Sequence, residues 1–262
     1  MSQSDENELE QLQADILRRR KLEQPKLPVK LAVSVPAAIS PEREQELARR
    51  EAAAKESERR GRVAHYQQLL TRSRGKRYSD CSIANFTLYG TTEQQAMQRG
   101  VVDAIGEYCR NLEANVADSY GVFLFGPCGT GKDHLATFVA RVFIQVTAEP
   151  VRWVCGAELY QQLRDSFDGK KTEGEVLRPY ISAPMLWISD PLPVKGELSP
   201  FEASALYRLI ESRYSNRRPT MMTANLGPSE ADKQFGPAVA RRLRETTVQL
   251  YCNWPSYRRG NQ

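Results

Sequence analysis

The chain has 262 residues, 40% of them hydrophobic, which is enough to bury the core of one sizeable α/β domain with a smaller appendage. Its net charge of +5 is mild for a nucleic-acid binder, although the basic residues gather in clusters that suit phosphate contacts. The chain lacks an apolar run of the roughly 20 residues that a membrane span needs, and its first residues are polar and acidic. We therefore expect a cytoplasmic protein with no membrane partner.

The cysteines and histidines argue against a structural metal site or a disulfide framework. The five cysteines form no C-x-x-C pair, and His65 and His134 are the two histidines. An odd number of scattered cysteines with two imidazoles does not match the ligand spacing of zinc sites or the pattern of small disulfide-rich domains.

Residues 1–40 are predicted to form a docking helix followed by a proline-rich linker. Four apolar side chains fall on one side of a helix over residues 6–22, namely Leu9, Leu12, Ile16 and Leu17. Four prolines punctuate the stretch after it. The low apolar content of this segment leaves a disordered tail as the alternative. The expected fold thus includes an N-terminal extension that is helical or partly disordered.

Residues 41–77 are predicted to form an exposed, charged helical segment. From Pro41 to Arg62 almost every residue is Glu, Arg, Ala or Lys. These residues favour helix, but they offer few large apolar side chains for burial. The helix is expected to continue through Leu70 and to end near the glycine and basic residues of 72–77.

Residues 78–262 are predicted to form a compact α/β domain, because apolar strand patterns alternate with helical ones. Strands are expected at 122–125, 151–155, 185–189 and 220–223, and helices at 93–114, 135–143, 157–166 and 200–214. Such alternation predicts a parallel sheet with helices on both faces. Ligands of these sheets bind at the carboxyl ends of the strands.

The loop after the first strand fits the phosphate-binding pattern G-x-x-x-x-G-K-[ST] except at its last position, which is Asp133. Its glycines let backbone N–H groups turn toward phosphate oxygens, the following helix adds its dipole, and Lys132 reaches the β and γ phosphates. A glycine-rich turn that caps an ordinary helix is the alternative. The predicted nucleotide-binding residues are Gly126, Pro127, Cys128, Gly129, Thr130, Gly131, Lys132, Asp133 and His134.

Two polar residues follow later strands of the predicted sheet. Asp190 ends the apolar strand Met185-Leu-Trp-Ile-Ser, as does the carboxylate that holds magnesium in P-loop ATPases. Asn225 ends the next strand, where its amide could orient water or sense a γ-phosphate. A solvated Asp-Pro turn and an ordinary Asn turn are the respective alternatives.

Four sequence blocks together resemble one family. They are Gly121-Val-Phe-Leu-Phe-Gly-Pro-Cys-Gly-Thr-Gly-Lys-Asp-His-Leu-Ala136, Tyr207-Arg-Leu-Ile-Glu-Ser-Arg-Tyr-Ser-Asn-Arg-Arg-Pro-Thr220, Thr223-Ala-Asn-Leu226 and Ala240-Arg-Arg-Leu-Arg-Glu245. This series resembles the AAA+ ATPase domain of DnaC/IstB-type proteins, which are bacterial replicative helicase loaders and their transposition-helper relatives. The resemblance spans residues 78–259 and implies a P-loop NTPase fold.

The resemblance also implies ATP and Mg²⁺ as cofactors and a role for each motif residue. Lys132 corresponds to the Walker A lysine, Asp190 to the Walker B motif and Asn225 to sensor 1. Arg242 corresponds to the arginine finger that reaches the ATP of a neighbouring subunit, with Arg241 beside it, which implies a homo-oligomer in the ATP-bound state. Arg258 is the sensor 2 candidate.

The chain departs from this family at two places that leave ATP hydrolysis open. Asp133 stands where the family has Ser or Thr, and the carboxylate could itself ligate magnesium. Ser189-Asp190-Pro191 stands where the family has two adjacent acids. If Asp190 is the metal ligand, Pro191 takes the place of the water-activating acid. If Ser189 aligns with the ligand, Asp190 becomes the base and Asp133 supplies the metal carboxylate.

The function expected from the resemblance is that of a helicase loader in DNA replication, with a replicative DNA helicase and single-stranded DNA as partners. The first alternative is a transposition helper that binds duplex DNA. The second is a nucleotide-gated scaffold that binds ATP with little or no hydrolysis.

Overall fold

The computed structural model describes residues 40–169, 171–193 and 197–257, so the docking helix expected at 6–22 and its linker lie outside the described residues. The chain divides into two compact units, Met1–Arg50 and Glu51–Gln262. In the first unit the described part is the start of helix α2, whose exposed surface carries an ion pair between Arg50 and Glu46.

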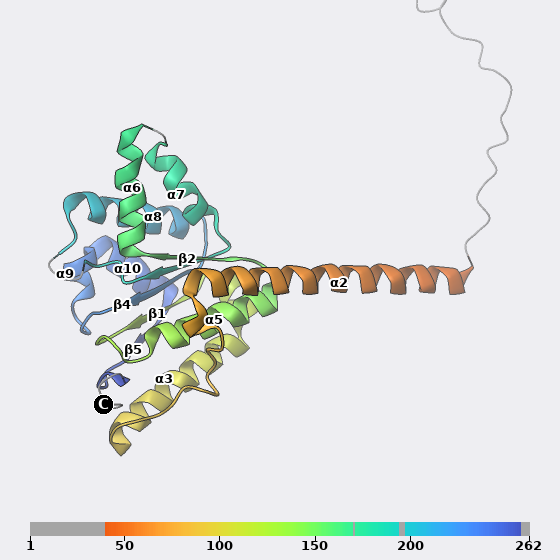
Figure 1. Cartoon of the computed structure of the whole chain (residues 1–262), viewed down its shortest axis with the longest axis horizontal. Coiled ribbons are helices and arrows are strands. Elements are labelled where there is room, and N and C mark those ends of the chain that lie inside the picture. The colour runs from red at the N-terminus through yellow and green to blue at the C-terminus, as the bar shows by residue number, and fades with distance from the viewer. Residues whose placement is uncertain (1–39, 170, 194–196, 258–262) are drawn as a thin grey trace, which may run out of the picture. The chain divides into compact units, whose positions relative to one another are not determined.

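Helix α2 runs from Pro41 to Arg74, so a single helix covers most of the segment expected to be helical (Figure 1). Acidic residues in its first turn and basic residues in its last turn complement the helix dipole. Within the second unit α2 is fastened to the end of helix α5, because Arg59 donates hydrogen bonds to the carbonyls of Gln145 and Val146. Two of its side chains, Val63 and Leu70, are buried.

The sheet has five parallel strands in the order β2-β3-β4-β1-β5, which confirms the expected parallel sheet. The strands are β1 Gly121–Phe125, β2 Val151–Cys155, β3 Met185–Ser189, β4 Thr220–Ala224 and β5 Thr247–Tyr251. Because β4 lies between β1 and β3, the segments that follow these three strands meet at one edge of the sheet. The order therefore brings the phosphate-loop sequence, Asp190 and Asn225 together.

Helices connect the strands, and some of them were absent from the sequence prediction. They are α3 Thr92–Arg110, α4 Leu112–Ala117, α5 Lys132–Thr147, α6 Gly156–Asp165, α7 Glu173–Ser182, α8 Pro200–Ser215, α9 Ala231–Phe235 and α10 Pro237–Thr246, with short 3-10 turns η1 Lys76–Tyr78 and η2 Ser166–Asp168. The strands and helices predicted between residues 120 and 215 occur at their places, whereas the helix predicted at 93–114 is divided at Asn111 into α3 and α4. The prediction lacked α7, α9, α10 and β5. None of the described helices is long and apolar enough to span a membrane.

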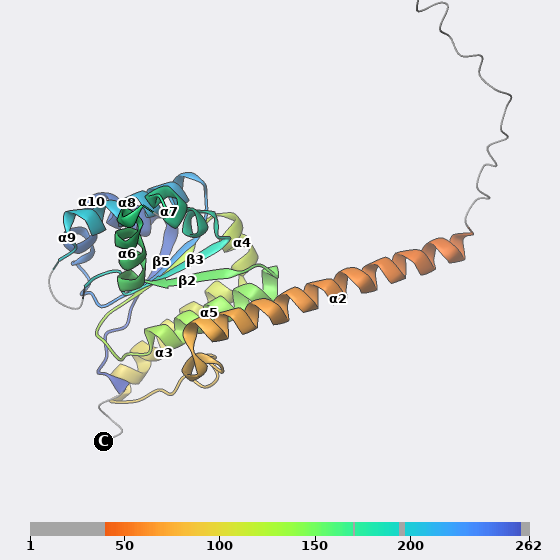
Figure 2. The ribbon, with the colours of Figure 1, turned by 45° about the horizontal axis from the view of Figure 1, so that its top comes forward.

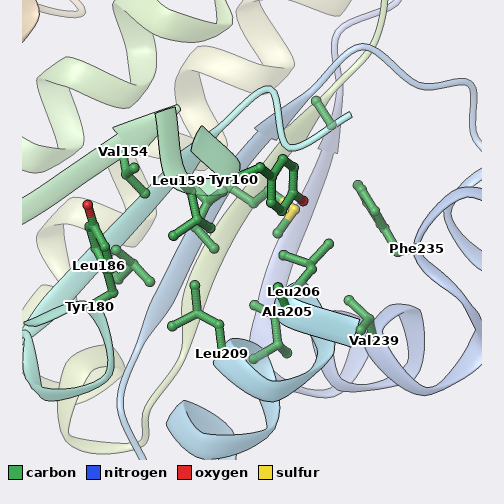
Figure 3. Packing of buried hydrophobic residues seen from close by; sticks show 14 of the residues in the cluster. Val154, Leu159, Tyr160, Tyr180, Leu186, Ala205, Leu206, Leu209, Phe235 and Val239 are labelled. Carbon is green, nitrogen blue, oxygen red and sulfur yellow. The ribbon is translucent and has the colours of Figure 1, made fainter. Parts of the chain in front are cut away.

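Helices cover both faces of the sheet, as expected. In Figure 2, α3 and α5 lie on one side of the strands, and α6, α7 and α8 lie on the other. Side chains alternate along β3 accordingly: Trp187 packs in the core beneath α5, whereas Leu186 and Ile188 pack in the opposite core. Figure 3 shows part of that second core, where Leu159 from α6 and Leu206 and Leu209 from α8 pack together. Both cores hold the strands rigidly beneath the site.

A buried arginine joins α8 to its surroundings at the amino end of β4. Arg213 is completely buried, and its guanidinium donates to the carbonyls of Tyr180, Ile181, Ala183 and Pro219 at 2.6–3.1 Å. Its Nε donates to the Thr220 hydroxyl at 3.0 Å. Burial lowers the pKa of this guanidinium to about 9. The saturated hydrogen bonding marks Arg213 as a structural residue.

Candidate nucleotide-binding site

The loop between β1 and α5 has the backbone of a phosphate cradle. Gly126, Gly129 and Gly131 have φ values of 138°, 84° and 91°, which L side chains rarely adopt. A Cβ on Gly126 would also lie 2.5 Å from the Cys252 carbonyl oxygen, and one on Gly129 would lie 2.0 Å from the Ser256 hydroxyl. These two positions therefore require glycine, both for conformation and for space.

Lys132 begins α5, and its ammonium group lies inside the loop. The side chain is 6% exposed, and Nζ donates to the carbonyl oxygens of Gly126 at 2.8 Å and Pro127 at 2.7 Å. It also donates to Oδ1 of Asn225 at 3.0 Å. Burial lowers the pKa of this ammonium. A buried cation whose hydrogen bonds go to carbonyl and amide oxygens is electrostatically suited to receive an anion.

Asp190 and Asn225 complete a chain of contacts that starts at Lys132. The Asn225 amide nitrogen donates to Asp190 Oδ1 at 3.0 Å, while its oxygen accepts from Lys132. Asp190 directly follows β3 with a left-handed φ of 43°, and its N–H donates to the Thr223 carbonyl at 2.9 Å. Burial, and next the charge of Asp133, raises the pKa of the Asp190 carboxyl. A carboxylate that lines a cavity beside a lysine, with a left-handed backbone and a raised pKa, is typical of a functional site.

Ser189 and Asp190 point to different surroundings, which bears on the two alignments left open by the sequence. Ser189 is buried, and its hydroxyl accepts a hydrogen bond from Trp153 Nε1 at 3.1 Å. Asp190 lines the cavity beside the glycine loop together with Asn225. The geometry thus favours Asp190 as the carboxylate that faces a ligand, and Pro191 follows it in the chain.

Asp133 lines the same cavity and has three polar neighbours. The Thr223 hydroxyl lies 3.4 Å from Oδ1, and the Tyr78 hydroxyl lies 3.5 Å from Oδ2. The Arg74 guanidinium forms an ion pair with Oδ2 at 3.3 Å. Arg74 and Tyr78 had no part in the predicted site, because they lie far from Asp133 in sequence and belong to no motif.

The oxygen atoms at this place fit a hard divalent cation such as Mg²⁺. Asp133 and Asp190 are close enough for the charge of one to raise the pKa of the other, and the Thr223 hydroxyl lies beside them. No group of three or more Cys, His, Asp and Glu side chains that could hold a metal occurs among the described residues. Magnesium commonly takes one or two carboxylates and completes its shell with phosphate oxygens and water. The donor set therefore suits a metal that arrives with a nucleotide.

The cavity has a volume of about 440 Å³, within the range of small-molecule sites. It is also lined by residues that the sequence prediction missed, among them Asn85, Phe86, Thr87, Tyr89 and Tyr257. These residues lie outside any motif, so the sequence held no signal for them. Aromatic side chains in the lining of a cavity beside a glycine loop suit a nucleobase attached to a phosphate chain.

The C-terminal segment and the first turn of α5 hold the loop in place. Trp254 Nε1 donates to the Thr130 carbonyl at 2.9 Å, and the Tyr257 N–H donates to the Gly129 carbonyl at 3.0 Å. Cys128 is an exposed free thiol in the loop, and the His134 ring lies 2.8 Å from the Ser82 carbonyl oxygen. Both line the cavity. Arg258, the sensor 2 candidate, lies outside the described residues.

Arg241 and Arg242 lie on α10 and do not line this cavity. Arg242 is 20% exposed, forms an ion pair with Glu211 and lies over the ring of Tyr214 at 5.3 Å. Arg241 is 76% exposed and pairs with Glu245 at 2.8 Å. The structure thus separates the predicted arginine finger from the site of its own chain, and of the two residues Arg241 is the more accessible.

The sheet order, the glycine loop between β1 and α5, and the Lys132–Asn225–Asp190 chain of contacts together define a P-loop nucleotide-binding protein of the AAA+ class. The chain belongs to the family described as IstB-like ATP binding protein, whose sequence profile matches residues 93–258. This match spans every strand of the sheet and all three motif residues.

Other comparisons agree with this family. The chain is 28% identical over 205 residues to the replicative helicase loader DnaC of Escherichia coli strain K12, and the match covers 77% of this chain and 79% of that protein. A crystal structure of the DnaC helicase loader is similar to 68% of this chain and 99% of its own length, with a TM-score of 0.58 and 20% identity. A crystal structure of DnaI is similar over 68% of this chain and 93% of its own, with a TM-score of 0.53 and 17% identity. The structural likenesses show a shared fold.

Proposed function

We propose that this protein is an ATP- and magnesium-binding AAA+ protein of helicase-loader type that acts in DNA replication. The observation that carries the proposal is the position of Lys132, buried within the glycine loop and linked through Asn225 to Asp190. A triphosphate in this loop would supply the anion that Lys132 lacks. Its γ-phosphate would contact Lys132 beside Asn225. Asn225 would thereby sense whether the γ-phosphate is present.

Asp133 and Asp190 are the residues that would hold magnesium in this proposal. The metal would neutralise charge on the β and γ phosphates. It would also relieve the repulsion between the two carboxylates, which raises the pKa of Asp190. Nucleotide affinity should therefore depend on magnesium, with Thr223 supporting the ligand through its contact with Asp133.

Hydrolysis is expected to be slow, because the position after Asp190 is Pro191 and provides no carboxylate to activate water. With Asp190 facing the metal, no second acid follows it on β3. A nucleotide-gated scaffold with little turnover is the outcome that this geometry favours within the helicase-loader role. ATP binding, rather than phosphate release, would then change the state of the protein.

A replicative helicase is the proposed protein partner, and single-stranded DNA the proposed nucleic acid. The similarity to DnaC, named as a replicative helicase loader, supports the first, and the docking surface would be residues 1–40. An exposed aromatic residue supports the second: Phe167 is 68% exposed and packs against Phe201 with ring centroids 5.4 Å apart. Exposed aromatic rings beside basic residues stack on the bases of single strands. Lys171 supplies one such charge nearby in sequence.

Self-association is proposed through the arginine pair of α10. Arg241 is accessible in the single chain, whereas Arg242 would have to leave Glu211 to reach a neighbour. An arginine that reaches the triphosphate of the next subunit makes activity depend on assembly. Comparison of Arg241→Ala with Arg242→Ala in nucleotide-dependent sedimentation distinguishes them, since the variant of the contacting residue should remain monomeric with ATP.

Nucleotide titration of the full chain tests the central proposal. Lys132→Ala should weaken ATP binding about 10- to 100-fold, since it removes a charge-assisted hydrogen bond to phosphate. Asp190→Ala should weaken binding in the presence of magnesium and have little effect in a chelator. Arg208→Ala, on the exposed surface of α8, is the control and should leave affinity unchanged. Equal ATP affinity in the wild type and Lys132→Ala would contradict the proposed nucleotide site.

Competition between nucleic acids separates the helicase-loader proposal from the transposition-helper alternative. A single strand should displace a labelled single strand with ATP present, and Phe167→Ala should weaken that binding by about 1–3 kcal/mol. Preference for duplex DNA, unaffected by Phe167→Ala, would favour the transposition helper instead.

A further inference from the structure

Arg74, the last residue of α2, lies against two aromatic rings and forms an ion pair with Asp133 of the phosphate loop. Its guanidinium carbon lies 3.8 Å from the ring centre of Trp153 and 4.5 Å from that of Tyr78. The side chain is 11% exposed. Contact with two rings restricts the guanidinium and removes most of its water.

The hydrogen-bond donors of Arg74 are incompletely satisfied. Its Nε and Nη2 atoms are buried, and neither has a hydrogen-bond partner among the described residues. Nη2 lies 3.3 Å from Oδ2 of Asp133 in an ion pair. Buried donors without acceptors cost free energy, so their position requires a compensating interaction. The charge of Asp133 is the partner that the structure provides.

Asp133 itself needs an explanation, because phosphate loops of this pattern end in a hydroxyl residue. A carboxylate there adds a negative charge beside the place of the triphosphate. Two unit charges about 7 Å apart at an effective dielectric of about 20–40 interact by roughly 1–2 kcal/mol. Without compensation, this repulsion would weaken nucleotide binding about tenfold.

We infer that Arg74 is a positioning residue of the nucleotide site, acting as the internal counter-ion of Asp133. The inference rests on the proposed nucleotide binding. It explains how this loop accommodates a carboxylate in its last position, and it joins that loop to the end of α2 through one ion pair. Magnesium is the second cation that neutralises Asp133, so Arg74 and the metal are alternative sources of the same charge.

A double-mutant cycle on ATP affinity, measured with a fluorescent ATP analogue in magnesium and in chelator, tests this inference. In chelator, Arg74→Gln should weaken binding about tenfold, because it exposes the charge of Asp133. Asp133→Asn should strengthen it, because Arg74 is then an unopposed cation. The double variant should return to within about twofold of the wild type. In magnesium the loss in Arg74→Gln should shrink, since the metal supplies the missing charge.

Opposite signs for the two single variants distinguish this role from simple packing. Arg72→Gln is the matched control, since Arg72 is an exposed arginine in the same helical turn, and its affinity should equal that of the wild type. An equal loss in Arg74→Gln and the double variant would overturn the inference. If Arg74→Gln does not fold, Arg74→Lys decides, because it keeps the positive charge without the planar guanidinium. The inference requires that Arg74→Lys bind ATP in chelator within about twofold of the wild type, and a tenfold loss overturns it.

The outcomes separate this inference from the proposed function. If Lys132→Ala weakens binding while the Arg74 and Asp133 variants lack the opposite signs, nucleotide binding stands and the counter-ion role falls. If the unaltered chain binds no nucleotide with or without magnesium, both fall.

Discussion

Arg213 and Arg74 are both buried arginines, but they lie at different ends of the sheet and have different surroundings. At the amino end of β4, the five contacts of Arg213 are carbonyl oxygens and a hydroxyl, all at hydrogen-bond distance. Near the phosphate loop, Arg74 lies against two aromatic rings, and two of its buried donor atoms have no hydrogen-bond partner within the part of the chain that the structure describes. The hydrogen bonds of Arg213 therefore stabilise the fold. The unsatisfied donors of Arg74 instead indicate a charge that serves the nucleotide site.

The largest expected effect is a loss of stability at the amino end of β4, where Arg213 makes its hydrogen bonds. Arg213→Met should lower the free energy of unfolding by about 3–5 kcal/mol, because it leaves several buried carbonyl groups without donors. Chemical denaturation followed by circular dichroism measures this loss. Arg208→Met on the same helix is the control, since Arg208 is 46% exposed and forms one ion pair, with Glu173, so its loss should cost clearly less than the loss of Arg213. Similar losses in both variants would remove the distinction between the two ends.

A smaller effect of opposite sign is expected at the functional end. The pKa of Asp190 is raised in the folded chain, so its ionised form opposes folding at neutral pH, and this cost disappears as the pH falls through the raised pKa. Asp190→Asn should therefore raise the melting temperature at neutral pH by about 2 °C, because screening limits the charge penalty to about 0.5 kcal/mol. Thermal melts at several pH values should show the gain vanish in acid. A gain that persists there would point to packing instead.

The smallest expected effect leaves stability unchanged and concerns two thiols. Cys128 is exposed in the phosphate loop, whereas Cys252 is fully buried, and burial raises the pKa of its thiol to about 12. A maleimide should modify Cys128 in the native protein and leave Cys252 unmodified until the chain unfolds. ATP with magnesium should slow the reaction of Cys128, as followed by peptide mass spectrometry. Modification of Cys128 at the same rate with and without nucleotide would mean that the loop is not covered.

The sequence predicts those parts of the fold whose signal is local. The apolar runs of β1, β3 and β4 and the glycine loop carry their own patterns, and the polar residues that follow these strands meet because parallel strands share an edge. By contrast, β5 is Thr-Val-Gln-Leu-Tyr, which has only two aliphatic residues and is a strand through its pairing with β1. Helix α7 was missed because it contains Pro179, a residue unfavourable to helix, although the helix begins with a capping box at Thr172.

The candidate site divides in the same way. Lys132, Asp190 and Asn225 stand in recognisable contexts, so their meeting was predictable from strand order. The partners of Asp133 were not, because Arg74 and Tyr78 come from the far end of α2 and the turn after it, more than 50 residues away by their numbers. The residues around Phe86 and Tyr89 form no regular element, so periodicity offers no signal for them. Non-local electrostatics and irregular backbone thus limit what sequence patterns reveal here.

One of the rings against which Arg74 lies, that of Trp153, is stacked on a second tryptophan in the core. The Trp153 and Trp187 rings are stacked with centroids 5.0 Å apart and planes within 6°, and Trp187 is completely buried. Because indole emission responds to a neighbouring cation, this stack is a natural optical probe of the ion pair with Asp133. Any event that moves Arg74 should change the wavelength or intensity of tryptophan fluorescence. The unlabelled protein therefore carries its own signal for the state of its phosphate loop.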